Sequence, residues 1–198
     1  MNSEYVKIPK SFYERTDVVE IARDLVGKYL FTHIDGFTTG GRIVETEAYN
    51  GRRDKACHAY NKRTARTEIM YESGGLAYIY LCYGIHHLFN IVTNQSGYAD
   101  AVLVRAIEPV IGIDIMQSRY GGTHPMISNG PGKLSKALGI SKSLNGTNLT
   151  EDKIFLAELK SQKRPKIAVS KRIGVDYAEE DALLPWRFYV EDNEWVSK

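Results

Sequence analysis

Residues 42 to 49 alternate between two kinds of side chain. In the run Arg-Ile-Val-Glu-Thr-Glu-Ala-Tyr, Glu45, Glu47 and Tyr49 occupy every second position, and apolar or β-branched residues lie between them. Successive side chains of a strand point to opposite faces, so the pattern predicts both carboxylates and the tyrosine on one face. That face fits either a catalytic carboxylate beside an aromatic platform or a solvated edge strand whose charges discourage aggregation.

A second alternating run, residues 78 to 92, has a glycine near its centre. It predicts a β-hairpin that turns at Gly84 and carries three tyrosines on its first arm. Tyrosine is common in strands, so a packed sheet is the simplest explanation of most of this run. Tyr83 and Ile85, however, flank the turn and would form an apolar tip in water. We therefore expect the tip to insert into a binding partner.

The rest of the chain mixes strands and helices without the repeating order of parallel βαβ units. Helices are expected between an N-cap at Asp17 and Gly27, between Val110 and Gly121, and from Pro131 to Leu138. Strands are expected at 28–33, 37–49, 78–92 as a hairpin, 101–106, 167–170 and 187–190. Residues 50–73 are charged and irregular, which is typical of a functional loop with at most one helical turn. The fold class is therefore α+β, with an antiparallel or mixed sheet and flanking helices.

Length and charge restrict the class of protein. A chain of 198 residues is sufficient for one domain with a full core, so we expect a single domain over residues 1–198. No apolar run is long enough to span a bilayer, and the first seven residues lack the apolar core of a signal peptide, so we expect an intracellular protein without a membrane partner. A net charge of +2 permits nucleic-acid binding without indicating it.

Cysteine and histidine positions give no metal-binding pattern. Cys57 and Cys82 are distant in sequence, and we expect both to be reduced and structural. The five histidines match no known ligand spacing, so we expect no metal and no cofactor. A metal-dependent hydrolase would need ligands from scattered positions, which disfavours it. Its candidate ligands would be His58, His86, His87 and Glu47.

The segment Asn-Gly-Pro-Gly-Lys-Leu, residues 129–134, opens one predicted helix. Its glycine-rich start and Lys133 are suited to contact a phosphate through backbone N–H groups and the helix dipole. A plain helix cap with a surface lysine explains the same residues equally well. The segment is not a P-loop, because no glycine stands at the required upstream position, Ile127.

Several fragments, taken in order, carry a family resemblance that each alone would not. They are 42–49, Ala56-Cys57-His58, 78–84, Asn90-Ile91, Val104 to Pro109, 129–134, Arg187 to Val190 and Trp195 to Ser197. In this order they resemble the alkyladenine (3-methyladenine) DNA glycosylase family, over residues from about Ala22 to Ser197. The resemblance implies a curved, partly barrel-like sheet from which the hairpin protrudes.

The resemblance also implies how damaged DNA would be bound. A base inside a duplex must be flipped out before its glycosidic bond can be reached. The resemblance assigns Tyr83 to the gap left behind, with Ile85 as its neighbour. It places Tyr49, His58 and Tyr80 in the pocket that stacks on the extruded base. Alkylated purines are often cationic, and a pocket rich in π faces favours a cation.

The chemistry implied by the resemblance is hydrolysis. Glu47 matches the general base that activates a water, and Arg105 matches an arginine that helps to hold this water and keeps Glu47 ionised. Strand parity alone does not separate Glu47 from Glu45, so the choice rests on the family motif. Asn90 matches a position that crowds the exocyclic amine of guanine. No lysine is placed to form a Schiff base, so we expect a monofunctional enzyme that leaves an abasic site.

The expected partner is double-stranded DNA that contains a damaged purine of the 3-methyladenine, hypoxanthine and ethenoadenine class. We expect a monomer, located in the cytoplasm and nucleoid of a bacterium or in the nucleus of a eukaryote. The alternative is a non-catalytic nucleic-acid binder that stacks bases on the tyrosine hairpin, although such a binder has little use for Glu47 near phosphates. The chain departs from the family pattern at Cys57, Cys82 and the pair His86-His87. These differences leave open which lesions are preferred and how tightly the hairpin tip holds DNA.

Overall fold

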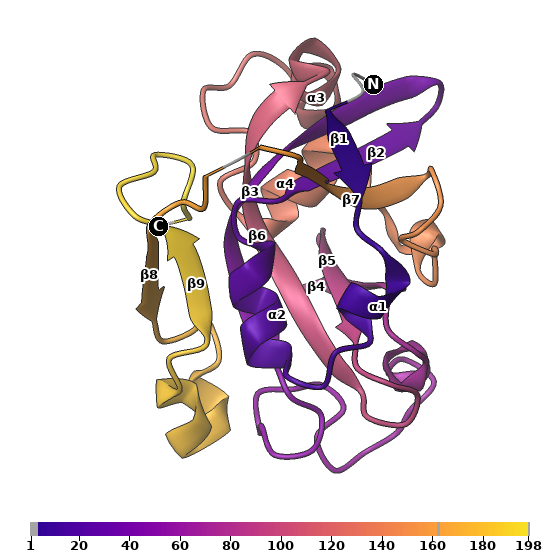
Figure 1. The fold of residues 1–198 in the computed structure, drawn as a ribbon, viewed down its shortest axis with the longest axis vertical. Helices are drawn as coiled ribbons and strands as arrows, with labels where there is room; N and C mark the ends of the chain where they lie inside the picture. Colours follow the sequence, from indigo (N-terminus) through magenta and orange to yellow (C-terminus); the bar gives the residue numbers. More distant parts are fainter. Residues whose placement is uncertain (1–3, 162, 198) are drawn as a thin grey trace.

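The computed structural model describes residues 4–161 and 163–197. Within these residues, nine strands form one sheet whose strand pairs are all antiparallel (Figure 1). The strands are β1 (Tyr5–Lys7), β2 (Tyr29–Ile34), β3 (Phe37–Tyr49), β4 (Ala77–Cys82), β5 (His86–Thr93), β6 (Asp100–Ile111), β7 (Ile154–Leu159), β8 (Ile167–Ser170) and β9 (Arg187–Val190). The main path is β1-β7-β2-β3-β6-β5-β4, and the β8–β9 pair joins it at β3.

Short helices connect and cover the strands. They are α1 (Lys10–Tyr13), α2 (Val18–Leu25), α3 (Ile113–Tyr120), α4 (Pro131–Ala137) and the 3₁₀ segments η1 (Glu68–Tyr71), η2 (Lys142–Leu144) and η3 (Asp176–Leu183). Helix α2 begins where the Asp17 carboxylate accepts hydrogen bonds from the backbone N–H groups of Val19 and Glu20. This capping satisfies two of the N–H groups that a helix start leaves free.

Strand β3 is the central element of the sheet. Strand β6 pairs with it from Gly40 to Tyr49, and the opposite edge is shared by β2, which pairs with residues 37–42, and β9, which pairs with residues 45–47. Register shifts near Gly40 and on both sides of Glu45 bend the β3–β6 ladder, and the sheet curls accordingly (Figure 1). The two carboxylates of β3 therefore lie inside the sheet, with a strand on each side.

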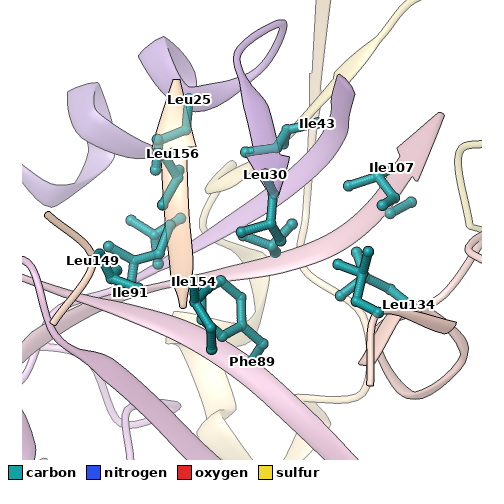
Figure 2. Packing of buried hydrophobic residues seen from close by; sticks show 14 of the residues in the cluster. Leu25, Leu30, Ile43, Phe89, Ile91, Ile107, Leu134, Leu149, Ile154 and Leu156 are labelled. Carbon is teal, nitrogen blue, oxygen red and sulfur yellow. The ribbon is translucent and has the colours of Figure 1, made fainter. Parts of the chain in front are cut away.

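One apolar cluster holds the sheet and helices together. Figure 2 shows side chains from separate elements converging in it, including Leu25 of α2, Ile43 of β3, Phe89 of β5 and Leu134 of α4, all fully buried. Burying one such side chain stabilises the fold by roughly 1.5–3 kcal/mol. Thr46 also donates from its hydroxyl to the Ala22 carbonyl oxygen at 2.7 Å, which fixes α2 against β3. One face of β3 is thus committed to the core.

The α+β class, the curved sheet and the projecting hairpin predicted from the sequence are confirmed, and of the antiparallel and mixed alternatives the sheet is antiparallel. The edge-strand explanation of the acidic pattern is wrong, because Glu45 and Glu47 are fully buried between β6 and β9. The helix expected from Val110 begins only at Ile113, since β6 continues to Ile111 and Gly112, with a φ of 69°, ends it. No helix in residues 4–161 or 163–197 has the length and apolar character needed to cross a bilayer.

Strands β1 and β7 were not predicted. Strand β1 has only three residues and no alternation to detect. Strand β7 carries six residues and pairs with both β1 and β2, so its place depends on partners far away in the chain.

Candidate active site

A cavity of about 460 Å³ opens beside the β4–β5 hairpin, and we call it the aromatic cavity. Seven of the residues predicted for the site line it, and they come from five separate parts of the chain. They are Tyr49, His58, Tyr80, Tyr83, Asn90, Arg105 and Lys133. A concave site with apolar walls and a few converging polar groups is typical of a small-molecule or cofactor pocket. A second hollow of about 520 Å³, beside α2 and residues 163–167, contains none of these residues.

Aromatic rings form one wall of the cavity. The centroids of His58 and Tyr80 lie 4.6 Å apart, with their planes at 75°. Tyr78 lies behind them, and its hydroxyl is 3.0 Å from His58 Nδ1. Edge-to-face packing of this kind holds each ring at a fixed angle. The wall is therefore a rigid surface on which a planar ligand can stack.

The His58 imidazole is neutral at pH 7. Burial, and then the nearby cations of Arg66 and Lys62, lower the pKa of His58 to about 4. We expect the ring to titrate near pH 4 in the folded protein, measured by the pH dependence of its NMR signals, with His58→Gln as the control that assigns them.

The depressed pKa of His58 also links stability to pH. An unfolded histidine has a pKa of about 6.5, so as the pH falls the unfolded chain binds a proton on His58 before the folded protein does. The contribution of His58 to the free energy of unfolding therefore decreases as the pH drops from about 6.5 towards 4. Denaturation midpoints measured across that interval should fall less in His58→Gln than in the unmodified protein. An imidazole that titrates near 6.5 in the folded state would contradict the environment described here.

The Glu45 carboxylate has four protein donors, three at Oε1 and one at Oε2. It accepts from Arg105 Nε at 2.8 Å, from Arg187 Nε at 2.6 Å, and from the backbone N–H and hydroxyl of Ser197 at 2.7 and 2.8 Å. A carboxylate offers about four acceptor positions, and the four bonds from the described residues equal that number, although they crowd on Oε1. Glu45 therefore holds together β3, β6, β9 and the segment near the C-terminus.

The Glu47 carboxylate has one fewer donor among the described residues. It accepts from the Tyr49 hydroxyl at 2.8 Å, from the Ile173 backbone N–H at 2.8 Å and from Arg105 Nη1 at 3.3 Å. All three of these partners line the aromatic cavity, and Glu47 lies directly behind them. Glu47 thus keeps one acceptor position and adjoins the cavity wall.

Arg105 is the cation between the two carboxylates. Burial lowers its pKa, but Glu47 and Glu45 raise it by more, so the pKa of Arg105 lies above its usual value. The guanidinium is therefore charged at every accessible pH. It fixes Glu45 and Glu47 relative to each other, because Nε and Nη1 of one rigid group contact both.

Asn90 is held firmly in the cavity wall. Its side-chain nitrogen donates to the carbonyl oxygens of Tyr78 at 3.1 Å and Leu88 at 3.3 Å. The side chain is buried between the two arms of the hairpin. A ligand in the cavity therefore meets a fixed polar group at this position.

The hairpin tip, residues 82–85, carries the exposed apolar residues that the sequence predicted. Tyr83 is 91% exposed and Ile85 is 72% exposed. Tyr83 and Gly84 have φ angles of 50° and 72°, and Ile85 donates its N–H to the Cys82 carbonyl at 3.1 Å, as in a type I′ turn. Ile85 does not line the aromatic cavity, whereas Tyr83 does.

The first residue of β5, next to the hairpin tip, contacts the start of α4. A Cβ at Gly132 would lie 2.8 Å from the His86 ring, so only glycine fits there without a shift. Lys133 donates to Asn129 Oδ1 at 2.8 Å and lines the same cavity. These contacts place the glycine-rich segment in the wall of the cavity.

Sequence reasoning missed a buried ion pair beside the cavity. Arg172 and Asp54 make two hydrogen bonds, one of 2.8 Å, and both side chains are fully buried. The Arg172 guanidinium lies 4.8 Å from the centre of the Tyr49 ring, and the next residue, Ile173, donates to Glu47. The two partners are 118 positions apart and match no motif, so nothing in the sequence indicated this pair.

The cysteines are free thiols, as predicted. Burial raises the pKa of Cys57 to about 12, which makes it unreactive. Within residues 4–161 and 163–197, no three His, Cys, Asp or Glu side chains gather in a way that would hold a metal ion. The four ligands of the metal-hydrolase alternative are thus not grouped in the fold.

Comparison with known proteins was made last. Residues 11–194 match the model of the methylpurine-DNA glycosylase family. The chain is 45% identical to a Desulfitobacterium hafniense protein over 96% of this chain and 98% of that one, and 48% identical to a Chlamydia felis protein over 91% and 94%. A Methanocella arvoryzae protein is 45% identical over 96% of both chains. Each of the three is named "Putative 3-methyladenine DNA glycosylase".

Proposed function

The chain belongs to the methylpurine-DNA glycosylase family, and we propose that it flips a damaged purine out of double-stranded DNA and hydrolyses its N-glycosidic bond. The proposed substrates are the 3-methyladenine, hypoxanthine and ethenoadenine class. The observation that carries the proposal is the position of Glu47, whose carboxylate lies behind a cavity with aromatic walls and keeps an acceptor position free. Membership of this family by itself supports a role in DNA repair.

Flipping comes first in the proposed mechanism, because the glycosidic bond inside a stacked duplex is out of reach. Tyr83 would enter the stack where the nucleotide leaves it, with Ile85 beside it. Their exposure supports this role, since the tip has large apolar surfaces that the protein's own core does not cover. The tip adjoins the aromatic cavity, so one movement would fill the gap and deliver the base.

The extruded base would then stack on the walls of the aromatic cavity. Tyr49, His58 and Tyr80 supply the ring faces, and the edge-to-face contact between His58 and Tyr80 keeps those faces in place. Asn90 would meet the edge of the base and disfavour guanine by crowding its exocyclic amine. Its two bonds to backbone carbonyls support that role, because a fixed side chain discriminates better than a mobile one.

The proposed chemical step is displacement of the base by water. Glu47 takes a proton from the water as its oxygen bonds to the anomeric carbon, and the carbon–nitrogen bond breaks with its electrons leaving on the base. The carboxylate also stabilises the positive charge that develops on the sugar. Arg105, together with Tyr49, keeps the Glu47 carboxylate in one orientation.

The proposal has further parts that the geometry of the site does not decide. Lys133 would contact a DNA phosphate from the wall of the cavity. The product is an abasic site on an intact strand, the enzyme is monofunctional, and it acts as an intracellular monomer without a metal or cofactor. A non-catalytic nucleic-acid binder would use the same tip and rings, but it would have no use for a buried carboxylate beside the cavity.

Release of free base decides between the two functions. Duplexes that carry one hypoxanthine, one ethenoadenine or one 3-methyladenine are incubated with excess protein, and free base is measured by chromatography. We expect base release from the damaged duplexes and none from an undamaged one. Tight binding to all the duplexes without release of base would establish the binder and contradict the glycosylase.

Tyr83→Ser tests the role of the hairpin tip. If Tyr83 offsets the cost of unstacking, this change should weaken binding to a damaged duplex by roughly 1–3 kcal/mol and slow base release. The melting temperature should hardly change, because Tyr83 is almost fully exposed. The loss should be smaller for a lesion in single-stranded DNA, where less stacking is broken.

Phe37→Ser provides the matched control. Phe37 is 49% exposed and follows the β2–β3 turn, so it is another exposed aromatic beside a hairpin turn, but it does not line the aromatic cavity. It should leave DNA binding unchanged. A Tyr83→Ser protein that binds and excises normally but melts several degrees lower would show that Tyr83 stabilises the fold instead.

A further inference from the structure

Three arginines surround the aromatic cavity, and their charges are compensated differently. Arg105 contacts two carboxylates, and Arg172 is paired with Asp54. Arg66 is exposed on the loop before η1, and among the described residues no carboxylate lies within ion-pair distance of it. Its positive charge is therefore not neutralised by a neighbour.

Arg66 lies against the two rings of the stacking wall. Its Cζ is 4.8 Å from the centre of the Tyr80 ring, and one terminal nitrogen is 3.4 Å from each nitrogen of His58. Equal distances to both ring nitrogens indicate a guanidinium lying against the imidazole rather than one directed hydrogen bond. The protein's own Arg66 therefore already makes the cation–π contact that the Tyr80 ring could offer to a cationic ligand.

We propose that Arg66 makes the aromatic cavity select neutral damaged purines over cationic ones. The inference rests on the proposed function and refines its substrate class, because 3-methyladenine in DNA carries a positive charge whereas hypoxanthine and ethenoadenine do not. A cationic base stacked on Tyr80 and His58 would be repelled by the guanidinium against the same rings. A neutral base would meet no such repulsion.

The geometry sets the size of the effect. A base stacked on the wall would lie roughly two stacking distances, about 7–8 Å, from the guanidinium. Two like charges at that distance, partly shielded by solvent, alter a rate or binding constant by about 3-fold to 30-fold. His58 already responds to this charge, since Arg66 is the second-largest cause of its low pKa, after burial.

The test compares Arg66→Gln with a matched control in the same loop. Arg63 is also exposed and also lies over a tyrosine, with its Cζ 4.6 Å from the Tyr71 ring, but it is paired with Glu68 and contacts no ring of the cavity. Arg63→Gln therefore removes the same charge without changing the cavity. Both variants should melt like the unmodified protein.

The measurement is single-turnover base release from two duplexes of one sequence, one with cationic 3-methyladenine and one with neutral hypoxanthine. Each rate is divided by the spontaneous rate for that duplex, and the cationic-to-neutral ratio is compared between proteins. We expect Arg66→Gln to raise the ratio by about 3-fold to 30-fold and Arg63→Gln to leave it within about 2-fold. The pKa of His58 should rise in Arg66→Gln alone.

Two other outcomes overturn the inference for different reasons. If Arg66→Gln lowers both rates and DNA affinity equally, with an unchanged ratio, the arginine contacts a DNA phosphate and does not select by charge. If the unmodified protein releases neither base, the proposed function fails, and the inference fails with it. Base release by the unmodified protein therefore separates failure of the inference from failure of the function.

Discussion

Replacing Glu47 with glutamine should reduce single-turnover base release by about 10²-fold to 10⁴-fold, the usual contribution of a general base. Glutamine has the shape of glutamate and retains one acceptor oxygen, so the fold should persist. It cannot take a proton from water, and it presents no negative charge to the sugar. Binding to a damaged duplex should remain close to that of the unmodified protein, measured by fluorescence anisotropy on the same DNA.

Glu45→Gln is the matched control for this prediction. Glu45 lies two positions away on the same face of β3 and is equally buried, but its acceptor positions are used by Arg105, Arg187 and Ser197. Its loss leaves the part-buried Arg187 without its carboxylate and Arg105 with Glu47 alone, and should destabilise the fold by about 3–5 kcal/mol. Base release per folded molecule should fall far less than in Glu47→Gln. A normal rate in Glu47→Gln, or the larger loss in Glu45→Gln, would assign the role to Glu45.

The sequence predicted the local features of the site well. Alternation along β3 indicated that Glu45, Glu47 and Tyr49 share a face, and the contacts of Arg105 with both carboxylates agree with this. The glycine of the β4–β5 hairpin located its turn, and the exposure of Tyr83 follows from that turn. These features depend on two-residue periodicity and turn chemistry, which short sequence segments carry by themselves.

The sequence did not predict which contacts surround those residues. Alternation along the strand places Glu45 and Glu47 on the same face and does not show which of them is the general base. Only their hydrogen-bond donors differ, which are Arg187 and Ser197 for Glu45 and Ile173 for Glu47. These donors lie 126 to 152 positions further along the chain, where no local pattern identifies them. The burial of the acidic face is a similar case, because it depends on β9 pairing with β3. Long-range pairing, rather than local propensity, therefore determines the electrostatics of the site.

Asp54→Asn, like Glu45→Gln, should cause a large loss of stability. Arg172 is fully buried, its Nε has no hydrogen-bond partner among the described residues, and Asp54 supplies the only carboxylate paired with it there. Removing one partner of a buried pair leaves an uncompensated charge, which costs about 3–5 kcal/mol. The free energy of unfolding, measured by urea denaturation, should fall by that amount.

Asp54→Asn should also affect the site itself. Arg172 donates to the carbonyl of Ala48, the residue after Glu47, and Ile173 donates its N–H to the Glu47 carboxylate. A displaced Arg172 would therefore loosen both the backbone next to Glu47 and the hydrogen bond to its carboxylate. Base release per folded molecule should therefore fall by about 10-fold or more, because displacements of about 1 Å are costly in catalysis.

Lys55→Gln is the control for the Asp54 prediction, since Lys55 is the adjacent residue and forms ion pairs with Glu179 and Glu180 at the surface. Exposed pairs contribute little, so the denaturation midpoint should not move. If Asp54→Asn behaved like Lys55→Gln in both stability and rate, the buried pair would be dispensable. If it lost stability but kept the normal rate per folded molecule, Arg172 would support the fold without positioning Glu47. The predicted combination, loss of both, requires that the ion pair fix residues 172–173 and that those residues in turn hold the Glu47 carboxylate behind the cavity wall.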